Sequence, residues 1–266
     1  MPRSNDPHRA HGAGTQTIAR AAHVLRLIAA RNSTGTRLVD LARHAKLERP
    51  TAHRILQGLA VEGLVRQEDS SKRWFLGRLV FELGLAASSQ FNVRDVCRPV
   101  LVRLAERTGD TVFLTVRSGF DSVCVDRMEG SFPIKTLTLE VGTRRPLGVG
   151  AGGLALLMAL PDQAVQDIVA ANVLRLPAYN HLTAPAVLKL VKRCKKIGYA
   201  LNDAHITPGA SSLGLPIRVR NGEPFLAISI GAISSRMTDE RQRELVSLIR
   251  AETTALEPAL DASAWP

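Results

Sequence analysis

Aromatic residues are scarce in this sequence, making up 4% of its 266 residues, and they form no alternating pattern with basic residues. Proteins that bind single-stranded nucleic acids use aromatic side chains as platforms on which the bases stack. The scarcity therefore argues against single-strand binding and leaves duplex DNA as the better polyanion partner.

Cysteine is also rare: Cys97, Cys124 and Cys194 lie far apart, without the spacing of a metal site or a disulfide framework. We therefore expect buried, reduced thiols in a cytoplasmic protein, and neither a metal nor another cofactor. No stretch approaches the roughly eighteen continuous apolar residues of a membrane span. Arg3 and Arg9 have no apolar segment behind them, so we expect neither a secretory signal nor a membrane partner.

The last two thirds of the chain lack a recognisable catalytic pattern. Their two histidines, His181 and His205, have no metal-ligand spacing, and no His/Asn signature accompanies Cys124. An enzyme with a DNA-binding head, using Asp203 and His205 as an acid–base pair, remains an alternative. Catalysis requires a fuller constellation than one pair of neighbours, so we expect no enzyme and no catalytic residue.

Acidic residues are outnumbered, with 24 Asp and Glu against 35 Lys and Arg and a formal net charge of +11. Residues 1–90 contain 14 basic and 7 acidic residues, a net of +7, whereas residues 91–266 contain 21 and 17, a net of +4. The first third therefore carries most of the excess, which favours contact with nucleic-acid phosphates there.

A winged helix-turn-helix is predicted in this basic third, after a polar tail at residues 1–14 that we expect to be disordered. Apolar residues recur at helical spacing in three segments: Ile18–Ala29, Leu38–Ala45 and Pro50–Leu59. Thr36 is the expected cap of the second helix, and Gly63 the stop of the third. Two short strands around a polar turn follow at residues 64–66 and 74–76.

The outward face of the third helix carries side chains suited to base edges. Arginine can bind guanine, glutamine can bind adenine, and threonine can contact phosphate or the thymine methyl group. The alternative is a solvated helix face with no partner. The predicted DNA contacts are Arg49, Thr51, His53, Arg54 and Gln57 on this helix and Lys72 and Arg73 in the hairpin, which would touch the backbone or the minor groove.

Residues 78–89 predict a helix that is apolar on nearly every side, and such a helix has to be buried. We favour burial against its copy in a second subunit; burial against the C-terminal domain of its own chain is the alternative. The favoured interpretation predicts a homodimer, or a dimer of dimers, that reads a pseudo-palindromic operator.

The remaining residues mix helical and strand patterns, which predicts an α+β domain around an antiparallel sheet with flanking helices. Helices are expected at residues 95–107, 150–160, 161–170 and 185–197 and from Asp239, with Thr238 as its cap. Strands are expected at residues 111–116, 122–125, 134–139, 211–219 and 225–234.

A ligand pocket is suggested by the last two strands, each of which has an aliphatic face and a face of small residues. Ser212 and Ser229 lie on the small faces, where they could orient a polar ligand. The run Gly150–Gly153 opens a helix whose free N–H groups favour a carboxylate. Close helix packing over the small faces and a plain tight turn are the respective alternatives.

Seven motifs in order resemble the IclR family of bacterial transcription regulators over most of the chain. They lie at Leu41–Ala42, Leu47–Leu56, Leu59–Val65, Val125–Gly130, Gly142–Leu147, Gly198–Ala200 and Glu223–Ile230. The chain departs from the family pattern where Lys46 replaces a glycine in the helix-turn-helix turn, Pro50 a serine, and Gly153-Leu154 a Gly-Lys pair. Gly148 also replaces a polar residue.

The resemblance implies a GAF-like effector-binding domain after the linker helix. It places effector contacts at Ala151, Gly152, Asn202 or Asp203, Ser212, Ser229 and Gly231, to which the turn adds Gly150. We thus expect a DNA-binding domain at residues 15–77, a linker at 78–90, and a domain at 91–266 that senses a small organic or aromatic acid. An architectural DNA-binding protein that senses nothing is the alternative.

Overall fold

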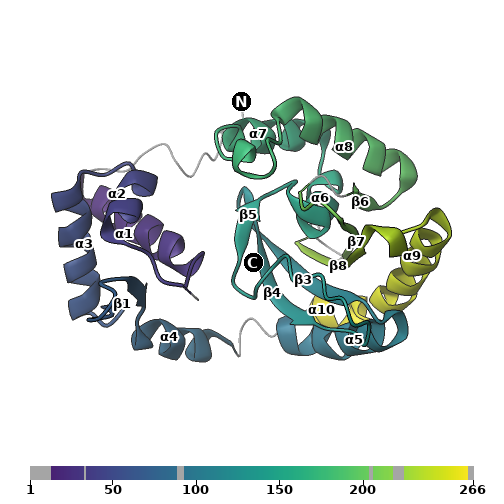
Figure 1. Ribbon diagram of the computed structural model, residues 1–266, viewed down its shortest axis with the longest axis horizontal. Coiled ribbons are helices and arrows are strands. Elements are labelled where there is room, and N and C mark those ends of the chain that lie inside the picture. The colour runs from purple at the N-terminus through teal and green to yellow at the C-terminus, as the bar shows by residue number, and fades with distance from the viewer. Residues whose placement is uncertain (1–12, 33, 89–92, 204–205, 218–224, 263–266) are drawn as a thin grey trace. The chain divides into compact units, whose positions relative to one another are not determined.

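Two compact units, Met1–Ser89 and Gln90–Pro266, make up the chain in this computed structural model (Figure 1). The structure describes residues 13–32, 34–88, 93–203, 206–217 and 225–262. Most of the predicted tail and residue 205 of the alternative acid–base pair lie outside these ranges. The last two residues of the predicted tail are helical instead, because the first helix begins at Ala13.

The first unit has the predicted order of three helices, a hairpin and a linker helix. Its elements are α1 (Ala13–Ala29), α2 (Leu38–Ala45), α3 (Arg49–Val61), β1 (Val65–Gln67), β2 (Trp74–Leu76) and α4 (Arg78–Ser88). The two strands pair antiparallel. Ile28, Leu41, Leu56 and Trp74 meet in one buried cluster that joins the three helices to the hairpin, so the apolar stripes of the sequence do form the core.

The turn between α2 and α3 and the end of α3 use left-handed backbone. Lys46 has φ of 53°, and its N–H bonds back to the carbonyls of Ala42 and Arg43, so a lysine occupies a conformation that glycine adopts at less cost. Gly63, with φ of 69°, follows the last helical turn as predicted. Thr36 was expected to cap α2, but this was wrong: Arg37 precedes the helix, and Thr36 pairs with Trp74 beside the hairpin.

The second unit is built on a six-stranded antiparallel sheet with strand order β5-β4-β3-β8-β7-β6. The strands are β3 (Thr111–Ser118), β4 (Asp121–Met128), β5 (Arg144–Pro146), β6 (Ala200–Asp203), β7 (Ala210–Ile217) and β8 (Leu226–Ile233). Its longer helices are α5 (Val93–Thr108), α6 (Gly150–Met158), α7 (Asp162–Asn172), α8 (Ala184–Ile197), α9 (Asp239–Thr254) and α10 (Glu257–Ala262). Thr238 caps α9 as predicted, accepting a bond from the Arg241 N–H.

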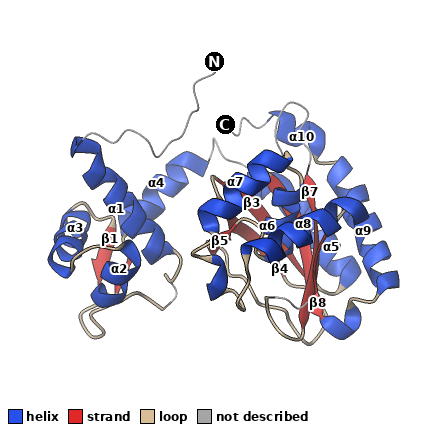
Figure 2. Cartoon of the chain, turned by 90° about the horizontal axis from the view of Figure 1, so that it is seen from above, coloured by secondary structure: helices blue, strands red, loops and turns tan. Residues whose placement is uncertain are grey.

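Helices cover both faces of this sheet (Figure 2). The aliphatic faces of β7 and β8, including Leu213, Leu215 and Ile228, pack with α5, α9 and α10 in one buried cluster. A second cluster joins α6, α7 and α8 on the other side and includes Ala227 of β8. Alternation along each strand thus assigns the aliphatic face to one helical layer and the small-residue face to the other.

One predicted strand was wrong and two strands were missed. Residues 134–139 are loop, and the carbonyls of Thr138 and Leu139 accept bonds from the side chains of Arg145 and Arg127 instead of a neighbouring strand. Ile134 and Leu137 are exposed, so the alternation that resembled a strand reflects threonines turned toward the interior. β5 at Arg144–Pro146 holds that edge instead, pairing with β4, and β6 carried too short an apolar pattern to be recognised.

Candidate DNA-binding surface and ligand pocket

Helix α3 buries one face and presents the predicted DNA contacts on the other. Ala52, Leu56 and Leu59 are buried, which orients the helix against α2 and the hairpin. The side chains of Arg49, His53, Arg54 and Gln57 are exposed, and Thr51 is half-buried beside them. The structure thus brings the predicted row together as one polar, basic helix face.

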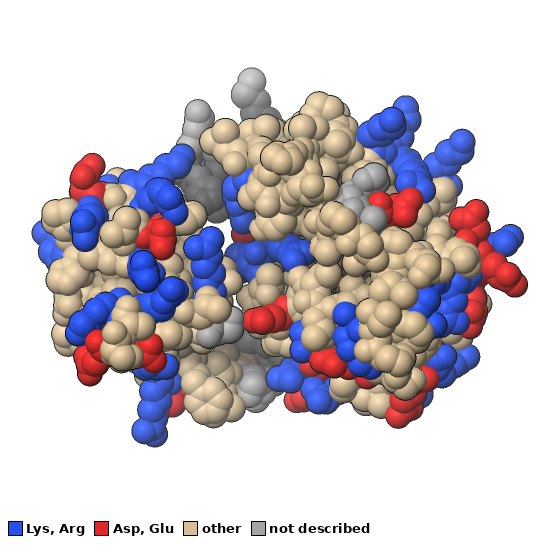
Figure 3. Space-filling model, viewed as in Figure 1, with Lys and Arg blue, Asp and Glu red and all other residues tan. Residues whose placement is uncertain are grey.

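The surroundings of this row are basic and open. Figure 3 shows Lys and Arg side chains at many points on the visible face of the first unit, with fewer acidic ones among them. A β-carbon added at Gly58 would have no neighbour within 4 Å, so nothing within the unit covers this part of α3. Such a surface suits the major groove of a duplex, which admits a helix and offers base edges to its side chains.

The two predicted DNA contacts in the hairpin, Lys72 and Arg73, differ in how available they are to DNA. Lys72 is exposed at the tip of the hairpin, whereas the Arg73 guanidinium donates bonds to the carbonyls of Thr34 and Gly35 at 3.3 and 3.1 Å. Arg73 therefore fastens the hairpin to the turn after α1 and is less available to a phosphate. Arg66, a further candidate, was not predicted: it is exposed on β1, and its guanidinium carbon lies 4.7 Å from the centre of the Phe75 ring. Its alternation with buried Val65 could have indicated its exposure.

Helix α4 exposes large apolar side chains. Phe81, Leu83 and Leu85 have 67%, 54% and 57% of their surface exposed. Leu79 differs, because it is half-buried and its β-carbon would lie 3.6 Å from one placed on Gly63. The helix that the sequence required to be buried is therefore largely uncovered within the first unit.

A pocket in the second unit lies at the start of α6, beside the small-residue faces of β7 and β8, and contains about 580 Å³ of space between atoms, its opening included. Six of the eight predicted effector contacts line it: Gly150, Ala151, Gly152, Asn202, Ser212 and Ser229. Asp203 is exposed, in line with the alternation of β6, and bonds only weakly with Ser211 at 3.5 Å. Gly231 lies next to Phe113 and Thr136, which line the pocket, without lining it itself.

The small residues of this region also allow α6 to approach the sheet closely. A β-carbon on Gly152 would lie 2.5 Å from Thr115 Oγ1, and one on Gly214 would lie 3.0 Å from the Ala151 carbonyl oxygen. Close helix packing, the alternative that the sequence left open, therefore explains part of the small-residue pattern on these strands. The pocket lies where this packing ends, at the first turn of α6.

Several polar groups at the pocket have no partner within the described residues. The hydroxyls of Thr115 and Thr136 are buried without a hydrogen bond. No side chain caps the N-terminus of α6, and the first N–H groups of a helix lack intrahelical partners. Buried polar groups normally find partners, so these groups favour a polar occupant.

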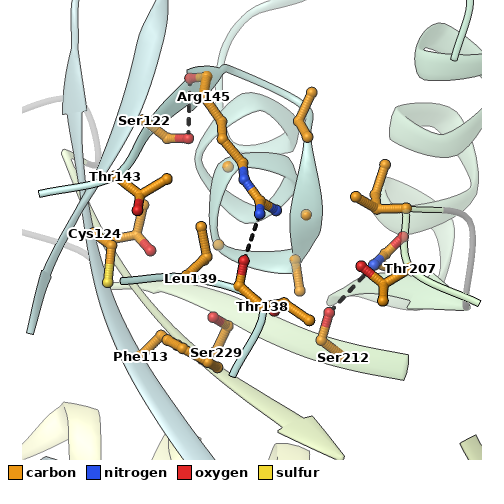
Figure 4. A pocket seen from close by; sticks show the side chains of 18 of the residues that line it. Phe113, Ser122, Cys124, Thr138, Leu139, Thr143, Arg145, Thr207, Ser212 and Ser229 are labelled. Carbon is orange, nitrogen blue, oxygen red and sulfur yellow. Dashed lines mark hydrogen bonds between the residues drawn. The ribbon is translucent and has the colours of Figure 1, made fainter. Parts of the chain in front are cut away.

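Arg145 lines the pocket but was not predicted as a site residue, although it lies in the motif Gly142–Leu147. Its side chain extends from β5 past the start of α6, and its Nη2 donates to the Thr138 carbonyl at 2.5 Å (Figure 4). The guanidinium also faces the Tyr179 ring, 5.8 Å away. Burial lowers the pKa of this arginine, because a desolvated cation is less stable than a hydrated one.

Cys124 also lines the pocket, and burial raises the pKa of its thiol to about 11. Burial likewise raises the pKa of Cys97 to about 12. Both thiols are therefore protonated near neutral pH and are weak nucleophiles. Within the described residues, no group of three or more His, Cys, Asp or Glu is arranged to hold a metal ion, and no helix is long and apolar enough to cross a membrane.

Two family models match the chain. The model described as "IclR helix-turn-helix domain" covers residues 17–69, and the model "Bacterial transcriptional regulator IclR C-terminal" covers residues 85–257. The second alone spans more than half of the chain.

Curated relatives agree with these models. The acetate operon repressor of Salmonella typhimurium is 28% identical over 239 residues, which are 88% of this chain and 86% of that protein. The transcriptional repressor IclR of Escherichia coli is 29% identical over the same shares, and the E. coli repressor AllR is 26% identical over 95% of this chain and 93% of its own.

Solved structures share the fold. A transcriptional regulator from Silicibacter sp. TM1040 has a TM-score of 0.78 and 22% identity, covering 94% of this chain and 98% of its own. An IclR homolog from Microbacterium hydrocarbonoxydans, solved as a complex with 4-hydroxybenzoate, has a TM-score of 0.70 and 22% identity, covering 93% and 100%.

Proposed function

The chain belongs to the IclR family of bacterial transcriptional regulators, and from that premise we propose how this member uses its two units. As a family member it is a DNA-binding regulator with an N-terminal helix-turn-helix and a C-terminal effector domain. We propose that the exposed row on α3 reads the bases of an operator and that a small organic acid, bound in the pocket of the second unit, changes the affinity for that operator. Such a regulator acts in the cytoplasm, where bacterial DNA lies.

The pocket carries the sensing half of this proposal. A buried, uncapped helix start beside unpartnered hydroxyls suits a carboxylate that also bears other polar atoms. The relative solved with 4-hydroxybenzoate supports an organic acid as the class of effector. The three curated relatives described above are repressors, which supports repression as the direction of control.

The test begins by selecting a binding sequence from a random duplex library with the full-length protein. Its affinity is then measured at fixed salt with and without each organic acid that raises the thermal stability of the protein. We expect a subset of acids to change affinity by roughly 5- to 150-fold, the range of typical allosteric coupling. Acids that bind without changing the affinity for DNA would contradict the proposed regulation.

We also propose that α4 joins two chains into a dimer. Exposed apolar side chains in a row, such as Phe81 and Leu85, favour burial against a second copy of the helix. Two DNA-binding units would then read half-sites about 34–36 Å apart, or a multiple of that distance.

Light scattering with the variant Phe81→Glu/Leu85→Glu tests this assembly. The side chain of Leu79 is avoided because it also packs within the first unit. We expect the parent to be a dimer or a dimer of dimers at micromolar concentration and the variant to dissociate. Leu174→Glu, at an apolar residue of the second unit that is 83% exposed, is the matched control and should leave assembly through α4 intact. A monomeric parent would contradict the proposal.

A further inference from the structure

Arg145 is the one charged side chain among the described residues that line the pocket. The other lining side chains are apolar, hydroxyl-bearing, amide or thiol groups, and the thiol is that of Cys124, which stays neutral. The buried carboxylates of this unit are already occupied elsewhere: Asp110 pairs with Arg236 and Arg241, and Asp126 with Arg94 and Arg98. Arg145 has no such acidic partner within the described residues.

A second anion-binding group lies directly beside this cation. The Arg145 Nη1 atom lies 3.9 Å from the position that a β-carbon would take on Gly150, the first residue of α6. The guanidinium and the first N–H groups of α6 therefore face the same small region. A planar guanidinium offers parallel donors to a carboxylate, and a helix start offers N–H groups and a favourable dipole.

We propose that Arg145 is the residue that selects the charge of the effector, and that the pocket accepts a monocarboxylic acid that carries hydroxyl or carbonyl oxygens and no ammonium group. This inference rests on the proposed sensing function and adds the class of ligand. The carboxylate binds between the Arg145 guanidinium and the start of α6.

The other residues that line the pocket indicate which charged groups the ligand does not carry. An ammonium group would be buried without a carboxylate to pair with, because no Asp or Glu is among the described lining residues. A second carboxylate would likewise lack a cation. Burying an unpaired charge costs far more than burying a hydrogen-bonded hydroxyl. The unpartnered hydroxyls of Thr115 and Thr136 instead suit neutral oxygen atoms of the ligand.

Calorimetric titration of the full-length protein tests the ligand class. The library contains monocarboxylates, among them 4-hydroxybenzoate and lactate, with the matching amides 4-hydroxybenzamide and lactamide, amino acids such as 4-hydroxyphenylglycine and serine, and the dicarboxylate succinate. We expect binding among the monocarboxylates, with the matching amide weaker by roughly 30-fold or more, since removing one partner of a buried charge pair has an effect of that size. Stronger binding by amides, amino acids or dicarboxylates would overturn the inference.

Arg145→Gln then assigns the preference to one residue. It should weaken the monocarboxylate by roughly 30-fold or more and remove most of the preference over the amide, and Arg145→Lys should restore part of both. Arg144→Gln is the matched control, because the neighbouring Arg144 bonds with Asp121 and Ser118 and does not line the pocket; it should keep the parent's preference.

A measurement without ligand separates this role from a structural one. Arg145→Met removes a half-buried cation that has no acidic partner among the described residues. The variant should therefore unfold at a temperature no lower than the parent, while losing the stabilisation by monocarboxylates. A clearly lower unfolding temperature, with the preference for acids retained, would overturn the inference. If the parent bound no member of the library, both the proposed sensing function and the role of Arg145 would be wrong. Acid binding that is unchanged in Arg145→Gln would contradict only the role of Arg145.

Discussion

The two units of this chain arrange their charged side chains in opposite ways. The first unit leaves its functional side chains exposed on α3, where Arg49 and Arg54 lie in the open. In the second unit the two buried carboxylates, Asp110 and Asp126, each pair with two arginines, and the half-buried Arg145 is turned toward a pocket. The difference follows from the partner: a duplex is read across an open surface, while a small acid has to be enclosed.

The same comparison explains how salt should act on each site. Exposed charges are screened by dissolved ions and bind phosphates with release of counterions, so affinity for DNA falls steeply as salt rises. A carboxylate enclosed beside Arg145 is screened far less.

Removing two exposed arginines from α3 should have the largest effect. Arg49→Ala/Arg54→Ala should weaken binding to the selected operator by roughly 30-fold or more at fixed salt, because each base contact contributes about 1–3 kcal/mol of discrimination. Fluorescence anisotropy measures this change. The control Lys192→Ala/Arg243→Ala removes equal charge from exposed residues of the second unit and should have a much smaller effect. Equal affinities of the α3 variant and the parent would show that α3 does not read the groove.

One glycine-to-alanine change in each unit should act with opposite sign. Gly152→Ala should destabilise the second unit by about 1–3 kcal/mol, because the added carbon meets Thr115 Oγ1 at 2.5 Å. Gly58→Ala, with nothing within 4 Å, should stabilise α3 by about 0.5–1 kcal/mol. Hydrogen exchange resolves the two units separately. Tolerance of Gly152→Ala without loss of protection would mean that α6 does not pack on the sheet as described.

Filling the pocket should remove the response to effector and spare DNA binding. Ser229→Leu fills the small-residue face of β8. Ser212→Leu fills that of β7 at a half-buried position, and this substitution should disturb α6 less. Both should lose a coupling of about 1–3 kcal/mol while the affinity for DNA without effector stays at the parent's value. Ser247→Leu, exposed on α9, is the control. A full response in both pocket variants would place the sensor elsewhere.

The buried thiols should produce the smallest effect, and only at high pH. Burial raises the pKa of Cys97 to about 12 and of Cys124 to about 11, from 9.0. A raised pKa favours the folded state below pH 9, and this contribution is lost as the pH rises from 9 toward the folded-state values. Thiol titration of the native protein at pH 8 should therefore be slow, and unfolding should become easier above pH 9. Fast labelling of all three cysteines in the native state would contradict their burial.

The elements of the first unit were predictable because each depends on local pattern. Apolar spacing defines α1 to α3, and the polar face of α3 is the complement of its buried stripe. Arg73 shows the limit: its sequence position suggests a free cation, but its bonds go to the carbonyls of Thr34 and Gly35, nearly forty residues earlier in the chain. Contacts of that kind leave no periodic signal.

The pocket was predictable only in part, for a related physical reason. Alternation along β7 and β8 places Ser212 and Ser229 on one side, and the glycines that open α6 are visible as a run. The role of Arg145 depends on which way a three-residue edge strand presents it and on the loop that replaces the predicted strand at residues 134–139. Neither feature has a local sequence pattern.

The coupling between the pocket and the DNA-binding unit is tested most directly by one titration with the parent protein. Affinity for the selected operator is measured at fixed salt while a monocarboxylic acid that binds the second unit is added to saturation. We predict that the affinity changes roughly 5- to 150-fold and that the concentration at half-effect matches the dissociation constant of the acid. An operator affinity that stays constant while the acid saturates the pocket would contradict this coupling.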